Sequence, residues 1–169
     1  MKMKKQIREA LIQELGDTTE AYLYRLDHTK AYNDEFRQNA RALYSFQTHM
    51  GTNYGVYFRY HWEKSPFVIV QFEADDAGGW SGTVNEGSMF RVIATIMQCA
   101  SDFWSSRYDV FRRDGVSSEI IDRMKGFRFQ TPEGDLNNSA RFKLYRTFIK
   151  RQFPSAKIRI RGEEALIIP

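Results

Sequence analysis

The chain has 169 residues, of which 42% are hydrophobic and 15% aromatic, a composition that excludes a disordered protein and suits one packed domain spanning residues 1–169. A single cysteine excludes a disulfide framework within the chain and suits a reducing compartment. No stretch approaches the roughly 18 consecutive apolar residues of a membrane span, and the basic N-terminus lacks the apolar run of a signal peptide. We therefore expect a cytoplasmic protein with no membrane partner.

The first predicted elements are a helix and a strand. Residues 2–15 place apolar side chains at steps of four, which predicts an N-terminal amphipathic helix that ends at Gly16. Residues 20–28 alternate enough to predict a strand. Residues 29–39 are polar, and they are compatible with either a loop or a short helix.

The clearest strand pattern lies in residues 41–73. Apolar residues alternate with other residues over 54–61, while 67–73 is a nearly continuous apolar run typical of a strand that is buried on both faces. Short turn-rich segments separate these stretches from each other and from residues 41–48. The pattern predicts an antiparallel meander of three strands.

A long helix is predicted over residues 87–105, after a loop rich in small residues. Its apolar side chains recur at steps of three and four, and they define the face expected to pack on the sheet. Cys99 falls near that face, so we interpret it as a buried core thiol.

The remaining elements alternate between strand and helix. Residues 126–130 predict a short strand, 136–153 a second amphipathic helix ended by Pro154, and 157–169 a terminal hairpin turning at Gly162-Glu163. The predicted fold class is therefore α/β, with a mixed, largely antiparallel sheet flanked by helices.

Positive charge is concentrated in the C-terminal third. Residues 123–161 contain eleven basic and two acidic residues, although the whole chain carries only +4. This asymmetry indicates an anionic partner, or alternatively a solvated face balanced by acidic neighbours. The candidate anion or nucleic-acid contacts are the basic residues of the second helix: Arg141, Lys143, Arg146, Lys150 and Arg151. The three histidines are dispersed, and no metal site is predicted.

The order of elements resembles the GCN5-related N-acetyltransferase (GNAT) fold. In that family a central helix follows the last strand of the meander, and the loop before the helix holds the pyrophosphate of coenzyme A. The resemblance implies acetyl-CoA or another acyl-CoA as cofactor, and a small molecule or a protein as the amine acceptor. The implied cofactor-binding residues are Gly82, Thr83, Asn85, Gly87 and Ser88.

A local match supports the same resemblance. Asn138 and the pair Leu144-Tyr145 have the spacing found on the helix after the fifth strand of GNAT proteins, where the tyrosine protonates the departing thiolate. By resemblance, Tyr145 is the candidate general acid. Glu73, on a strand where GNAT bases often lie, is a candidate general base, as is His61.

The segments Phe90–Ile96 and Ser139–Tyr145 also resemble a loose group of small bacteriophage proteins that are GNAT-like. The leading hypothesis is thus an acyl-CoA-dependent N-acyltransferase-like phage protein, acting in the host cytoplasm. Val84 and Met89 depart from the family's glycine-rich pattern, which leaves a degenerate cofactor site open. The alternative is a non-enzymatic, GNAT-shaped protein whose basic C-terminal face binds nucleic acid or a host protein. A virion or assembly component is a third reading.

Overall fold

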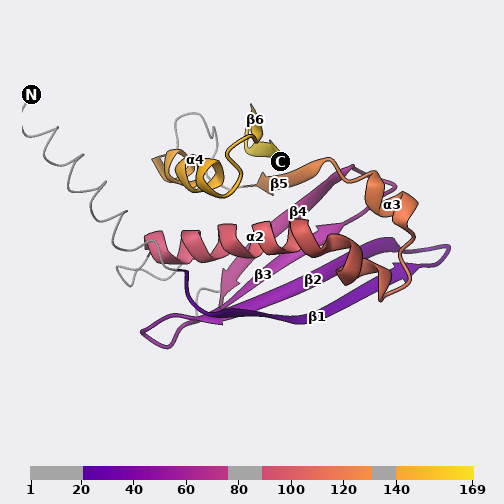
Figure 1. The fold of residues 1–169 in the computed structure, drawn as a ribbon, viewed down its shortest axis with the longest axis horizontal. Helices are drawn as coiled ribbons and strands as arrows, with labels where there is room; N and C mark the ends of the chain where they lie inside the picture. Colours follow the sequence, from indigo (N-terminus) through magenta and orange to yellow (C-terminus); the bar gives the residue numbers. More distant parts are fainter. Residues whose placement is uncertain (1–20, 76–88, 131–139) are drawn as a thin grey trace, which may run out of the picture.

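The computed structural model describes residues 21–75, 89–130 and 140–169, and these form a seven-stranded sheet with helices against it (Figure 1). The strands follow the order β1-β2-β3-β4-β5-β7-β6 across the sheet. Their bounds are β1 (Tyr24–Asn33), β2 (Gln38–Gln47), β3 (Asn53–Tyr60), β4 (Phe67–Ala74), β5 (Gly126–Gln130), β6 (Lys157–Arg161) and β7 (Glu164–Ile168). The helices are α2 (Met89–Arg112), α3 (Ser118–Asp122) and α4 (Ala140–Gln152).

Among the described strands, only β4 and β5 form a parallel pair. β4 and β5 run side by side in the same direction, and every other pairing is antiparallel. A parallel pair needs a long crossover, which α2 and α3 supply between β4 and β5. This arrangement confirms the predicted mixed, largely antiparallel sheet.

The meander has four strands instead of three, because the strand predicted over residues 20–28 joins it as β1. The ambiguous segment 29–39 contains the end of β1, the β1–β2 turn and the start of β2. The Asp34 carboxylate organises the turn by accepting hydrogen bonds from the backbone N–H groups of Phe36 (3.0 Å) and Arg37 (2.7 Å). The polar residues that left the prediction for this segment ambiguous are therefore the residues that form the turn.

α2 extends seven residues beyond the predicted end at residue 105. Val110 and Phe111 are buried and continue the apolar face, so nothing in the pattern stops the helix earlier. It ends where Val116 N–H bonds to the Phe111 carbonyl and Gly115 takes a positive φ of 83°, a common helix ending. The predicted N-terminal helix of residues 2–15 lies outside the described residues.

The core lies between one face of the sheet, here called the inner face, and the three described helices (Figure 1). Phe103 of α2 stacks on Phe58 of β3 with ring centroids 4.6 Å apart, and it also contacts Phe127 of β5. Tyr145 of α4 meets Phe72 of β4 edge-on, and Tyr60 of β3 donates a hydrogen bond to the Ile120 carbonyl of α3. All three helices therefore pack on the inner face. Cys99 is fully buried there, as expected, and burial raises the pKa of its thiol.

None of the helices in these ranges combines the length and the apolar character needed to cross a lipid bilayer.

Gly126 makes the junction between the parallel pair and the terminal hairpin possible. Its φ of 154° is one that side chains rarely adopt, and a Cβ placed there would lie 1.9 Å from the backbone oxygen of Ile167 in β7. The contact is with backbone, so no side-chain rotation relieves it. Close approach of β5 to β7 therefore requires glycine at this position.

We predict that Gly126→Ala destabilises the protein by at least about 3 kcal/mol, because β5 must move away from β7 to admit the methyl group. Urea unfolding followed by circular dichroism measures the loss. Gly115→Ala is the control, since Gly115 also has a positive φ but nothing within 4 Å of its Cβ position, and it should cost only about 1 kcal/mol. Equal losses in the two variants would contradict the steric explanation.

Candidate functional site

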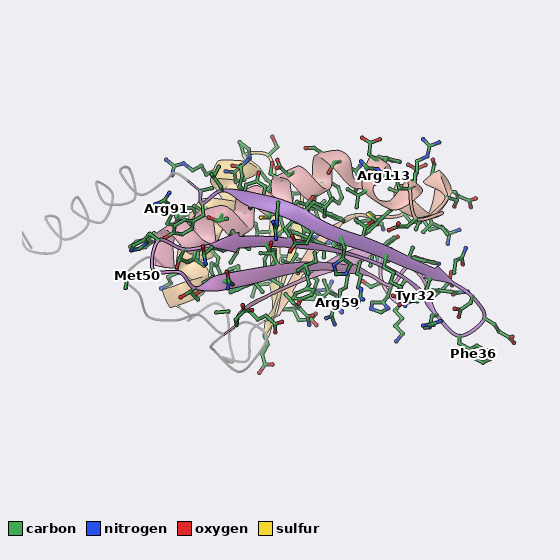
Figure 2. All side chains as sticks on the ribbon, turned by 90° about the horizontal axis from the view of Figure 1, so that it is seen from below. Tyr32, Phe36, Met50, Arg59, Arg91 and Arg113 are labelled. Atoms are coloured by element: carbon green, nitrogen blue, oxygen red, sulfur yellow. The ribbon has the colours of Figure 1, made fainter. Side chains whose placement is uncertain are left out.

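The face of the sheet opposite α2, here called the outer face, has no described helix packed on it. Figure 2 views the molecule along the sheet, with α2 and Arg113 on one side of the strands and Arg59 on the other. Along β2 and β3, buried residues point to the inner face and half-buried residues alternate with them. Apolar residues fill the inner positions, whereas charged and polar residues occupy many outer ones.

The strand register aligns five cations across the outer face. Lys30 lies opposite Arg41, Arg41 opposite Arg59, and Arg59 opposite Ile69. The same line continues through Arg128, Leu166 and Arg159. We call Lys30, Arg41, Arg59, Arg128 and Arg159 the cationic row. With strands about 4.8 Å apart, it crosses the whole sheet over about 29 Å.

The three middle members of the cationic row lack some of their hydrogen-bond partners. The Nε atoms of Arg41, Arg59 and Arg128 are buried and have no hydrogen-bond partner in the part of the chain that the structure describes. Glu164 lies 3.8 Å from Arg128 across the neighbouring strand. Arg59 lies 5.4 Å from the centroid of the Tyr57 ring. Buried polar atoms normally find partners, so these guanidinium groups are unusual.

The positive charge of the row shifts the pKa of neighbouring side chains. Burial lowers the pKa of His61, and the charges of Lys64, Arg59 and Arg128 lower it further. A hydrogen bond with Lys30 lowers the pKa of the Tyr32 phenol, and the charges of Lys30, Arg41 and Arg37 act in the same direction. The outer face therefore favours anions over a broad area, from β1 to β5.

Like charges directly opposite each other on a sheet cost stability, in the range of roughly 0.2–1 kcal/mol per pair. Lys30, Arg41 and Arg59 form two such pairs in succession. Hydrophobic packing on the inner face gains nothing from these cations, because they point away from it. The arrangement can hold a polyanion, whose charges would remove the repulsion.

The two predicted catalytic residues are not brought together. Tyr145 is buried, with an exposed fraction of 5%, and it packs on Phe72 on the inner face. Glu73, the next residue of β4, pairs with Gly55 on the outer face, where its carboxylate helps burial to raise the pKa of Tyr57. Glu73 is also far from His61, which lies beyond the other end of β3. Because Tyr145 and Glu73 lie on opposite faces of the sheet, one active site cannot contain both side chains.

The predicted cofactor residues, Gly82, Thr83, Asn85, Gly87 and Ser88, lie outside the described residues. Among the predicted anion contacts, Lys143, Arg146, Lys150 and Arg151 are exposed on α4, and Arg141 belongs to the first turn of that helix. Lys150 is engaged locally, because its ammonium donates a hydrogen bond to the Ala156 carbonyl just after the helix. These cations lie on the helical side of the sheet, away from the cationic row.

The described ranges contain no group of three or more His, Cys, Asp or Glu side chains that could hold a metal ion.

Comparison of the chain with protein-family models, with curated proteins and with solved structures found no significant match.

Sequence reasoning missed the three cations of the row that lie in the first half of the chain. Arg41 and Arg59 occupy outward positions of adjacent strands, and a turn centred near Gly51 places them opposite each other. That signal was present in the sequence. Their alignment with Arg128 depends on the parallel register of β4 and β5, which no local pattern specifies.

We predict that Arg41→Gln stabilises the folded protein by about 0.5 kcal/mol at low salt, because it relieves repulsion from Lys30 and Arg59. Thermal unfolding measures the gain, which should shrink as added salt screens the charges. Arg25→Gln serves as control, since Arg25 makes an ion pair with Asp27 at 2.7 Å and should give no gain. A loss of stability in Arg41→Gln would contradict the repulsion.

Proposed function

We propose that the protein binds nucleic acid through the outer face of its sheet. The observation that carries this proposal is the cationic row, with three buried guanidinium Nε atoms that lack partners among the described residues. Arginine guanidinium groups suit phosphate oxygens, which accept hydrogen bonds in a bidentate geometry and supply the missing negative charge.

A nucleic acid fits the row better than a single small anion does. The cations are distributed along a line of about 29 Å instead of converging on one point, so a ligand with regularly repeated charges satisfies more of them. Tyr57 places an aromatic ring beside the line, and aromatic rings on a sheet surface offer stacking area to bases. An acidic peptide would supply the charge without using the ring.

A second proposal keeps the resemblance to GNAT proteins, in which an acyl group passes from acyl-CoA to an amine. The support is positional. β4 and β5 are parallel, so their carboxyl ends share one edge of the sheet, and α2 begins at Met89 after β4. Tyr145 packs on Phe72, two residues from the last residue of β4. Ligands of open α/β sheets commonly bind at such an edge.

The nucleic-acid proposal predicts a steep dependence of affinity on salt. For a single-stranded oligonucleotide that contacts all five cations, the slope of log K against log salt should be about −3.5. Arg41→Gln and Arg59→Gln should each make the slope less negative by about 0.7, because one phosphate contact is lost. Fluorescence anisotropy of a labelled oligonucleotide, repeated at several salt concentrations, measures this slope.

Arg146→Gln is the matched control for that series, because Arg146 is exposed on α4 instead of the outer face. It should leave the slope unchanged. A change in Arg146→Gln with none in Arg41→Gln would show that the helical side binds and that the outer face does not. Equal affinity for polyglutamate of the same charge would contradict a nucleic-acid partner and favour an acidic protein.

The acyltransferase proposal predicts saturable binding of acetyl-CoA in a calorimetric titration, abolished by Gly87→Glu. Tyr145→Phe should preserve binding and lower acyl transfer to an amine about a hundredfold, because the leaving thiolate loses its proton donor. A folded protein that binds no acetyl-CoA would rule out that donor.

A further inference from the structure

A groove of about 620 Å³ lies beside the cationic row on the outer face. Leu43 and Tyr57 face each other across β2 and β3, one outward position along from Arg41 and Arg59, and they separate the row from the groove. A step of two residues along a strand is about 7 Å, so the groove begins within one side-chain length of the cations. Its volume lies within the range of small-ligand sites.

Two features of the strands border this groove. A register shift interrupts the pairing of β1 with β2 between Leu26 and His28, and Asp27 at the shift lines the groove. Such bulges often occur beside functional sites, because they redirect side chains. Gly55, which faces Ser45 in the same groove, is the second feature.

Gly55 allows the Tyr57 ring to lie along the strand. A Cβ at position 55 would lie 3.2 Å from the Tyr57 Cε2 atom and 3.4 Å from a methyl carbon of Leu43. Any larger residue there would displace the ring. Arg59 lies on the other side of Tyr57, so the ring stands between a guanidinium group and the groove. This position gives one flat apolar surface at the border of the two regions.

The polar groups in the groove are more mixed than those of the row. Asp27 and Asp75 contribute carboxylates, Gln47 and Asn53 contribute side-chain amides, and Arg25 contributes a guanidinium group that pairs with Asp27 at 2.7 Å. A hydrogen bond from Ser45 lowers the pKa of Asp27, which therefore accepts hydrogen bonds as a carboxylate at neutral pH. Carboxylates repel phosphate but accept hydrogen bonds from the amino groups of bases, such as N4 of cytosine.

We infer that the groove receives an unpaired nucleobase, stacked against Tyr57, while the adjoining phosphates lie on the cationic row. This inference rests on the proposed nucleic-acid function and adds selectivity for single strands. A base in a duplex is already paired and stacked, so its entry would require the duplex to open. An unpaired base that bears an amino group can stack on the Tyr57 ring and donate hydrogen bonds to the carboxylates.

The test compares three probes by fluorescence anisotropy with the full chain: a short oligodeoxycytidylate, an abasic oligonucleotide with the same number of phosphates, and a duplex of the same length. The base-bearing single strand should bind about tenfold more tightly than either of the others, as expected for one stacked base. Equal affinity for the cytidylate and the abasic strand would overturn the inference without needing any variant.

Two variants locate the effect. Gly55→Val displaces the Tyr57 ring, and Tyr57→Leu removes it; each should weaken cytidylate binding about tenfold and leave abasic binding unchanged. Arg41→Gln is the control, since it should weaken both strands alike. Equal losses for both strands in Gly55→Val and Tyr57→Leu would overturn the inference while leaving the row as the binding surface. Absence of binding to all three probes at low salt would overturn the proposed function itself, and the inference with it.

Discussion

The contact between Phe58 and Phe103 holds the two halves of the structure together. Phe58 belongs to the meander and Phe103 to the crossover helix, and both rings also contact Phe127 of β5. All three rings are fully buried. Because β5 is separated from β4 by more than fifty residues of chain, this aromatic cluster supplies the long-range contact that aligns the parallel pair.

Because the apolar side chains are concentrated on the inner face, charged and polar side chains can occupy the outer face. The described helices pack on the inner face, so outward positions contribute little to the core and tolerate charge. Alternation along each strand then places outward residues two positions apart, as in the order Gly55, Tyr57, Arg59. One fold therefore places a cationic row and a mixed polar groove side by side.

Local patterns predicted the elements better than they predicted the site. The period of the apolar residues in α2 and α4 correctly predicted most of their buried side chains, including Phe103 and Tyr145. The turn at Asp34 was missed because its polar residues are equally common in loops and helix starts. The row was missed because it exists only after β5 pairs with β4 and β7, and a shift of one residue in either register would move Arg128 to the inner face.

Partial burial of the arginines has opposite effects on folding and on binding. It costs stability, because three guanidinium groups lose solvent at Nε without gaining a protein partner. The same packing restricts the side chains before a ligand arrives, so less conformational entropy is lost when phosphates bind. An exposed cation on α4, such as Arg146, carries the same charge but must be ordered on contact. For equal charge, a polyanion would therefore lose less conformational entropy on the outer face of the sheet than on α4.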